Sequence, residues 1–459
     1  MGELFNNMTK TLISNRKWIL LPIETKAREL MSKILFACVG AERGFGVVIG
    51  GKSIIRGKQA VLPRGTFIEK SIGPGSLPLI QKAFDNKNRV SAWCEEGLIY
   101  LGKEDYKQRR VDLSSFKAID YFFVWGKKHF DDMESIVGSR NKLVPTGNPR
   151  FDLLRPELRN VFRKNVDKIK KKYGRIILLN TKFATINSNN KELNYLDFLK
   201  SLGKIKTKEE EETIKKFMAL NEKNFRVFLK LIPMLSRRYK DHTIIIRPHP
   251  SEDHIPWIEI SKEFNNVKVV FEGNANEWIM AADVMIHNNC TTGIEAFLLE
   301  KPVISFRPFK DESVEPPLPD LVSYKAGDEQ GLLLIIDRIV NDNDISIVER
   351  HEQMKVASEY ITNIEGRLAC DRILDVLEKL ELPKMSAIFP LPVSFKDYLK
   401  KIKKLFNLNK QYSYTTQKFP GLKLDEVQNF FENLKLVSRR FNDVKLIQVG
   451  EDGFCFYKE

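Results

Sequence analysis

The chain of 459 residues is too long for one hydrophobic core and indicates two domains with an additional segment. Its 75 basic and 60 acidic residues give a formal net charge of +15, an excess that suits phosphorylated ligands, an anionic membrane surface or nucleic acid. The sequence has no zinc-finger, RRM or KH pattern, so we expect no nucleic-acid partner. It also lacks an apolar run long enough to span a membrane and a signal-peptide core at its start, so we expect a cytoplasmic protein.

The cysteines give no sign of a metal centre or a disulfide framework. They show neither a CxxC motif nor paired spacing, and we expect them to be reduced residues of the core or of turns. The five are Cys38, Cys94, Cys290, Cys370 and Cys455. We expect neither a metal site nor a cofactor.

A first α/β domain is expected over residues 16–152. Short apolar runs alternate there with helical patterns, which is the order of a parallel sheet with crossover helices. Strands are expected at 18–23, 46–49, 59–62, 89–93, 121–124 and 142–145, with helices from residue 24, over 78–84 and over 127–136.

Charged residues follow two of these strands. Glu24 and Arg28 come directly after the first strand, and Glu95 and Glu96 stand in the turn after the strand that ends at Trp93. The carboxyl ends of parallel strands line ligand sites, so we expect these residues to face a cleft. An ordinary solvated turn is the alternative interpretation of the two adjacent acids.

A second α/β domain is expected over residues 153–380, after a charged linker at 155–172. Its first strand, 175–179, ends in Asn180 and Thr181, which are candidates for hydrogen bonds to a ligand. Apolar residues at helical spacing predict helices that pack on the sheet. These helices are expected within 206–239, 331–340 and 345–380.

The next strand, 243–246, is followed by Arg247-Pro248-His249-Pro250. The two prolines lack backbone donors and hold the turn rigid, so the guanidinium and the imidazole project from a fixed frame. Arg247 and His249 are therefore phosphate-binding candidates. A surface ion pair and a structural turn histidine are the alternative interpretations.

A further strand, 283–287, turns into a helix that begins near Ile294. Backbone N–H groups, two hydroxyls and the positive end of the helix dipole predict an anion site in this turn. The candidate residues are Asn289, Thr291, Thr292, Gly293 and Glu295, the last of which would face a ribose. The threonines could equally be plain N-caps, and a first-turn glutamate ordinary capping electrostatics.

The remaining segment, 385–459, has a different pattern. Apolar residues at helical spacing over 395–406 oppose five lysines, a pattern typical of a helix on an anionic membrane. A surface helix that packs on the protein's own core would read much the same. A helix is expected over 424–441, followed by a hairpin of 444–449 and 454–457.

Together these motifs resemble a known group of enzymes. The His-Pro turn, the threonine pair at a helix start and the string G-x-E-A-x-x-x-x-K-P-V from Gly293 to Val303 resemble the donor half of GT-B glycosyltransferases that use CMP-activated sugars, including bacterial Kdo and sialic acid transferases. They also resemble CDP-glycerol glycerophosphotransferases of teichoic-acid synthesis, whose G-x-P-R-x-D turn is similar to residues 146–152. The layout over about 16–375 is similar to that of surface carbohydrate biosynthesis proteins.

The resemblance implies a GT-B-like fold, with two Rossmann-like domains facing a cleft and a small C-terminal α+β appendage. It implies metal-independent transfer of a sugar, with a CMP-activated acidic sugar such as Kdo expected first, from a nucleotide donor to a glycan or lipid-linked acceptor. In related enzymes a first-domain acid deprotonates the acceptor, a role that falls to Glu96 first and Glu95 second, while His249 stabilises the leaving phosphate. A CDP-glycerol or alditol phosphotransferase and a non-catalytic binding module are the alternatives.

Overall fold

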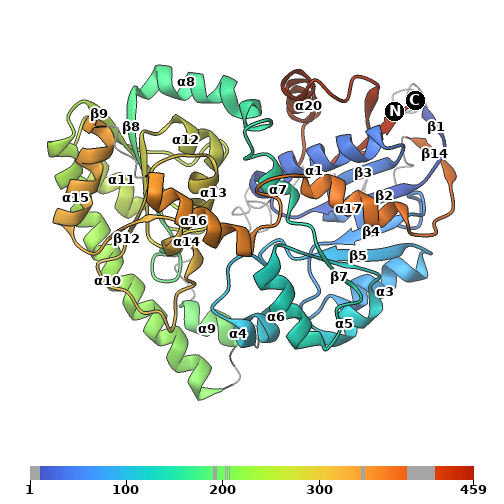
Figure 1. Cartoon of the computed structure of the whole chain (residues 1–459), viewed down its shortest axis with the longest axis horizontal. Coiled ribbons are helices and arrows are strands. Elements are labelled where there is room, and N and C mark those ends of the chain that lie inside the picture. The colour runs from blue at the N-terminus through green and yellow to red at the C-terminus, as the bar shows by residue number, and fades with distance from the viewer. Residues whose placement is uncertain are drawn as a thin grey trace, which may run out of the picture. The chain divides into compact units, whose positions relative to one another are not determined.

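The computed structural model describes residues 11–189, 194–201, 203, 205, 207–342, 347–389 and 419–459. The chain forms two compact units. Unit 1 consists of residues 1–98, 110–153 and 361–459, and unit 2 consists of residues 99–109 and 154–360. Each unit has helices packed against a largely parallel sheet (Figure 1), so the expected α/β class with two Rossmann-like domains is confirmed.

Unit 1 is built on eight strands in the order β15-β16-β3-β2-β4-β5-β6-β7. The six strands from β3 to β7 in this order are parallel, whereas β16 runs antiparallel to both of its neighbours. The strands are β2 (Trp18–Ile23), β3 (Gly46–Gly51), β4 (Thr66–Glu69), β5 (Arg89–Trp93), β6 (Phe122–Val124), β7 (Leu143–Pro145), β15 (Val444–Gln448) and β16 (Gly453–Lys458). Every residue of β2 and β3 is buried, as central strands covered on both faces require.

The helices of unit 1 centre on α1 (Lys26–Glu42), which contacts the sheet, α7, α17 and α20. Figure 1 shows α1 and α17 side by side over the strands. The carboxylate of Glu29 accepts hydrogen bonds from the backbone N–H groups of Glu24 and Thr25, which fills donors left open at the helix start. The other helices are α2 (Lys52–Ile55), α3 (Leu77–Asp85), α5 (Leu113–Ala118), α6 (Lys127–Val137), α7 (Pro149–Asp152), α17 (Ala369–Glu378) and α20 (Leu424–Ser438).

Unit 2 is built on six parallel strands in the order β10-β9-β8-β11-β12-β13. The strands are β8 (Arg175–Asn180), β9 (His242–Arg247), β10 (Val267–Val269), β11 (Val284–His287), β12 (Val303–Phe306) and β13 (Tyr324–Ala326). The earliest strand, β8, is central, and later strands extend the sheet on both sides of it. This is the strand order of a doubly wound sheet.

Helices cover both faces of this sheet. Phe228 and Ile232 of α10 (Lys208–Arg238), Trp257 of α11 (Ile255–Ser261) and Ile336 of α15 (Glu329–Asp337) share one hydrophobic core with the strands. On the other face α8 (Arg163–Tyr173) packs on α12 (Ala275–Ala281), and α12 on α13 (Thr292–Leu298). The remaining helical elements are α4 (Lys103–Arg110), η2 (Arg159–Phe162), α9 (Tyr195–Ser201), α14 (Leu318–Leu321), η3 (Arg338–Asp342) and α16 (Ile347–Tyr360).

Two predictions of local structure are wrong. Residues 59–62 form turns after α2, and the strand of this region is β4, from Thr66 to Glu69. The segment 155–172, expected to be a charged linker, mostly folds into η2 and α8. Its apolar residues, such as Val161, Phe162 and Val166, are buried at helical spacing, and its many lysines cover the exposed side of the helix.

The end of the chain belongs to unit 1. The predicted hairpin of β15 and β16 is present, and β16 continues the sheet next to β3. Strand β14 (Met385–Phe389) pairs with β1 (Thr11–Arg16) from the other end of the chain. The predicted amphipathic segment 395–406 lies outside the described residues. Within the described ranges, every helix is too short or too polar to cross a bilayer.

Candidate functional site

The carboxyl ends of the unit 2 strands bring predicted site residues into one row. Asn180 at the end of β8 pairs with Arg247 of β9 on one side and with His287 of β11 on the other. Because β8 comes first in the chain and the sheet extends from it in both directions, the strand order reverses between β8 and β11. Ligands of doubly wound sheets bind outside the strand ends at this reversal.

Buried polar atoms without a partner gather at this reversal. The Oδ1 atoms of Asn180, Asn288 and Asn289, the Nδ2 atom of Asn289 and the Oγ1 atom of Thr292 have no hydrogen-bond partner among the described residues. The side chains of the three asparagines are more than nine-tenths buried. Leaving such a group unpaired costs about 1–3 kcal/mol. We therefore expect a bound polar molecule to supply the missing hydrogen bonds.

Asn289 also has a strained backbone, with φ of 59°. A non-glycine residue enters this left-handed region at a cost, although Asn tolerates it better than most. The turn lets the backbone N–H of Cys290 donate to Nδ1 of His287 at 3.1 Å. Asn289 thus has both a strained backbone and two unpartnered side-chain atoms. Strained residues of this kind cluster at functional sites.

A lysine stands next to this cluster. Nζ of Lys182, two residues beyond β8, donates to the backbone oxygen of Asn289 at 3.4 Å. Burial lowers the pKa of this amine. The sequence did not single out Lys182, but its hydrogen bond to Asn289 places its amine next to the unpartnered amide atoms.

Glu252 holds the two loops of the site together, and the sequence analysis missed it. Its buried carboxylate accepts hydrogen bonds from Oγ1 of Thr181 at 2.9 Å, the backbone N–H of Phe183 at 2.8 Å, the backbone N–H of His249 at 3.2 Å and Nε1 of Trp257 at 3.1 Å. Burial raises its pKa, and these donors act in the opposite direction. In the sequence, Glu252 is one more acid in a polar turn, so no pattern pointed to it.

His249 lies in the exposed turn after β9. Its Nδ1 accepts a hydrogen bond from the backbone N–H of Ser251 at 3.2 Å. A nitrogen that accepts carries no proton, so the proton of the neutral ring is on Nε2. The turn thus fixes His249 as a hydrogen-bond donor through Nε2.

Arg247 points to a neighbouring loop. Its guanidinium donates to the backbone oxygens of Glu272 at 2.6 Å and Gly273 at 3.3 Å, and lies 5.3 Å from the ring centre of Trp278. Burial lowers its pKa to about 10. In this arrangement Arg247 fixes the loop between β10 and α12.

The turn before α13 is held by His287. Burial lowers the pKa of this histidine to about 3, so the ring is neutral, and its Nε2 lies 3.0 Å from Oγ of Ser323. A Cβ on Gly293 would come within 2.5 Å of the same nitrogen, so glycine is needed for packing. Thr291 makes no side-chain cap hydrogen bond, and Glu295 is buried in the first turn.

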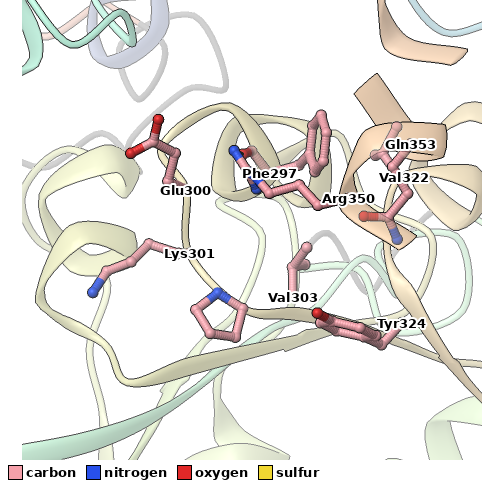
Figure 2. Close-up of a pocket in the computed structure, with 9 residues that line it drawn as sticks. Phe297, Glu300, Lys301, Val303, Val322, Tyr324, Arg350 and Gln353 are labelled. Carbon is pink, nitrogen blue, oxygen red and sulfur yellow. The ribbon is translucent and has the colours of Figure 1, made fainter. Parts of the chain in front are cut away.

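A hollow of about 250 Å³ lies at the opposite edge of the sheet (Figure 2), near the beginnings of β12 and β13. Figure 2 shows Arg350 against Phe297, whose ring centre is 4.8 Å from the guanidinium. Arg350 also donates to the backbone oxygen of Phe297 at 3.3 Å. None of the predicted site residues lines this hollow, and the amino ends of parallel strands are not where such sheets bind ligands.

The four predicted residues of unit 1 lie close together. Arg28 donates to Glu96 at 3.3 Å, and Arg110 forms a second ion pair with the same carboxylate. Although burial acts to raise it, these two arginines lower the pKa of Glu96 to about 2. Glu24 pairs with Lys52 at 2.6 Å and with Lys70.

Glu95 differs from its neighbour because it is buried, with 5% of its surface exposed. Its Oε1 accepts from Nε1 of Trp93 at 2.8 Å and lies 3.4 Å from Nζ of Lys33. Its Oε2 has no partner in the part of unit 1 that the structure describes. One of the two adjacent acids is thus neutralised at the surface, and the other keeps an open acceptor atom.

No protein-family model matches the chain, and no curated protein matches its sequence. Among solved structures, a putative UDP-N-acetylglucosamine 2-epimerase from Listeria monocytogenes is 11% identical with a TM-score of 0.49, over 80% of this chain and 96% of that one. The UDP-GlcNAc 2-epimerase from Methanocaldococcus jannaschii is 15% identical with a TM-score of 0.48, over 79% and 99%. A variant of the wall teichoic acid polymerase TagF is 12% identical with a TM-score of 0.47, over 79% and 88%.

Proposed function

We propose that the chain is a nucleotide-dependent glycosyltransferase whose donor binds unit 2 at the carboxyl ends of β8, β9 and β11. The observation that carries this proposal is the cluster of buried, unpartnered side-chain atoms of Asn180, Asn288, Asn289 and Thr292 at the strand reversal. A phosphate accepts hydrogen bonds from the amide and hydroxyl donors, and the hydroxyls of a ribose or sugar donate to the amide oxygens. One phosphorylated sugar compound therefore satisfies both kinds of open atom.

Two further groups suit a departing phosphate. The ammonium of Lys182 supplies positive charge beside the amides, and His249 supplies its Nε2–H from a turn fixed by Glu252. Transfer of a sugar leaves negative charge on the phosphate, and donors that are already in place stabilise it without reorganisation. Arg247 acts indirectly, because its guanidinium is bound to the loop after β10.

That loop offers a platform for the base. The ring of Phe271 is 56% exposed and is stacked on His254 with ring centres 4.5 Å apart and planes tilted by 18°. Arg247 and Trp278 both donate to the backbone oxygen of Glu272, which holds the loop in place. Aromatic faces of this kind bind any nucleobase by stacking.

The proposed transfer also needs a carboxylate to deprotonate the acceptor, and unit 1 offers two. A carboxylate with a pKa of about 2 is a weak base, which argues against Glu96, the first choice from the sequence. The open Oε2 of Glu95 makes Glu95 the better choice.

For the donor, a CMP-activated acidic sugar is the first candidate, transferred to a glycan or lipid-linked acceptor. A CDP-alditol is the second, and the spacing of the strands favours it. Neighbouring strands are about 4.8 Å apart, so the ends of β10 and β8 are separated by about 10 Å. A diphosphate bridges this distance between Phe271 and the amides more readily than a monophosphate.

The proposal is tested by calorimetric titration of the full chain with CMP, CDP, UDP and GDP. We expect one of them to bind, and Asn289→Gly to weaken it about tenfold through the loss of its amide contacts. Glycine adopts the φ of 59° without strain, so the variant should unfold at the same or a higher urea concentration. Lys87→Gly is the matched control, since Lys87 is also left-handed, with φ of 62°, but lies on the surface of unit 1.

Failure of all four nucleotides to bind, or undiminished binding by Asn289→Gly, would contradict the proposal. The products of slow donor hydrolysis then separate the two candidates. A CMP-sugar yields CMP and free sugar when its sugar is transferred to water, whereas CDP-glycerol yields CMP and glycerol phosphate.

A further inference from the structure

Unit 1 contains a cavity of its own, with a volume of about 270 Å³. It lies where β3, β4 and β5 end, close to the start of α1. Five basic residues line it, against the acids Glu69, Glu95 and Glu96. The basic residues are Arg28, Lys52, Arg56, Lys70 and Arg110. Each basic residue is paired with an acid: Arg28 and Arg110 share Glu96, Arg56 pairs with Glu69, and Lys52 and Lys70 share Glu24.

The cavity wall holds donors that lack an acceptor. The Nε atoms of Arg28 and Arg56 are buried and have no hydrogen-bond partner among the described residues. Each guanidinium is already oriented by a carboxylate, Arg28 by Glu96 and Arg56 by Glu69. An oxyanion in the cavity would be met by two fixed guanidinium groups, which bind phosphate and carboxylate well because of their planar array of donors.

The same wall holds acceptors that lack a donor. Oε2 of Glu95 and Oε2 of Glu69 have no partner in the described part of unit 1, and these residues are 5% and 1% exposed. A carboxylate oxygen in this position requires an N–H or O–H group. A plain anion such as phosphate satisfies the arginines but leaves these oxygens open, whereas a hydroxyl on the same ligand satisfies them.

The loop between β4 and α3 forms another part of the wall. It contributes Ser71, Pro74, Gly75 and Ser76, directly before α3. Gly75 has φ of 85°, a conformation that glycine adopts readily, and no atom lies within 4 Å of where its Cβ would be. Gly75 therefore leaves this part of the cavity open beside the two arginines.

We infer that this cavity is a second ligand site of the protein, specific for a phosphate monoester of a hydroxyl compound such as a polyol or a sugar. The phosphate lies toward Arg28 and Arg56, and a hydroxyl of the ligand donates to Oε2 of Glu95. The site consists of unit 1 residues only. It uses the same Oε2 of Glu95 to which the proposed transfer assigns deprotonation of the acceptor, but binding of its ligand does not require the nucleotide site of unit 2.

The test is calorimetric titration of the full chain with glycerol 3-phosphate, inorganic phosphate and glycerol. Glycerol 3-phosphate should bind best, inorganic phosphate more weakly and glycerol not measurably. Arg28→Gln should weaken both phosphate compounds about tenfold, because one charge-assisted hydrogen bond is lost. Arg28 is preferable to Arg56 as the target, since Glu96 keeps Arg110 as a partner, whereas the buried carboxylate of Glu69 would lose its ion pair.

A second variant tests the hydroxyl contact. Glu95→Gln replaces one carboxylate oxygen by an NH₂ group, so glycerol 3-phosphate should lose its advantage over inorganic phosphate. Arg226→Gln, on the exposed face of α10, is the control and should bind both as the natural chain does. Urea unfolding of each variant verifies that it is folded.

The inference is overturned if neither phosphate compound binds at millimolar concentration, or if folded Arg28→Gln and Glu95→Gln bind both as the natural chain does. Asn289→Gly should leave glycerol 3-phosphate binding unchanged. If nucleotides fail to bind but glycerol 3-phosphate binds and responds to Arg28→Gln, the cavity stands and only the proposed function falls.

Discussion

Two acids that are adjacent in the sequence have opposite environments in the fold. Glu96 is exposed and shared by Arg28 and Arg110, so its negative charge is stabilised. Glu95 points inward beside Trp93 and Lys33, with one oxygen unpartnered. Both acids lie in the turn that follows β5, which the bond from the backbone N–H of Gly97 to the oxygen of Cys94 closes, and this turn directs one acid inward and the other outward. The sequence shows the pair but not which acid takes which side.

This difference gives a prediction for stability at low pH. The pKa of Glu96 is about 2 in the fold, below the ordinary value of 4.5, so its ion pairs contribute stability above about pH 4.5 and lose it as the pH falls toward 2. Glu96→Gln removes this contribution. The difference in urea midpoint between the natural chain and the variant should therefore be larger at pH 5.5 than at pH 3.

The control for this measurement is Glu359→Gln, at an exposed position of α16. Its urea midpoint should stay near that of the natural chain at both pH values. A Glu96→Gln difference that is equal at pH 5.5 and pH 3 would show that the two arginines do not hold the carboxylate in its charged form.

At the scale of elements, the backbone of the loop between β10 and α12 is held by hydrogen bonds, and the loop carries an exposed aromatic ring. Arg247 at the end of β9 and Trp278 of α12 both bind the backbone of the loop. Phe271 is left stacked on His254 with more than half of its surface exposed. An exposed aromatic ring on a fixed loop is suited to recognition, because little conformational entropy is lost on binding.

We expect Phe271→Ala to separate binding of the base from binding of the phosphates. Loss of a stacked ring costs about 1–3 kcal/mol per base, so the affinity for the preferred nucleotide should fall at least several-fold. Pyrophosphate has no base, and its affinity should not change. Both are measured by calorimetric titration, with Leu334→Ala, an exposed position of α15, as the control. Equal losses for nucleotide and pyrophosphate would show that Phe271 supports the phosphate site instead.

At the scale of the whole molecule, the strands with the strongest pattern were predicted best. The ranges expected for β2, β5 and β8 agree with the structure to within one residue. The sequences of β2 and β8 are nearly continuous apolar runs, as is typical of buried parallel strands, and β5 is buried at all but its first residue. Residues 59–62 were misassigned because Val61 and Leu62 read as apolar strand residues, although they lie in a turn and Val61 is exposed. The row of Asn180 and Arg247 was predictable, because strand ends meet at one edge of a parallel sheet.

Other features depend on contacts that sequence spacing does not reveal. The carboxylate of Glu252 accepts hydrogen bonds from four donors that lie between residues 181 and 257. The guanidinium of Arg247 donates to the backbone oxygen of Glu272, which is 25 residues away in the sequence. The pairing of β1 with β14 and of β3 with β16 joins opposite ends of the chain. Neither period nor composition encodes which distant strand completes a sheet edge, so the sequence did not predict that β16 continues the sheet next to β3.

Our last prediction concerns this chain end. Phe456 of β16 is fully buried, and its ring meets that of Phe431 in α20 edge-on with centres 5.5 Å apart. If residues 419–459 complete the core of unit 1, Phe456→Ala should lower the free energy of unfolding by about 3–5 kcal/mol, because it removes a buried aromatic ring and leaves a cavity. Leu436→Ala, at a position of α20 that is 78% exposed, should change the free energy of unfolding by less than about 0.5 kcal/mol.

Urea unfolding followed by tryptophan fluorescence measures the stability of both variants, since Trp18 and Trp93 lie in the same unit. A loss below about 1 kcal/mol for Phe456→Ala would mean that the chain end packs on unit 1 without being needed for its folding.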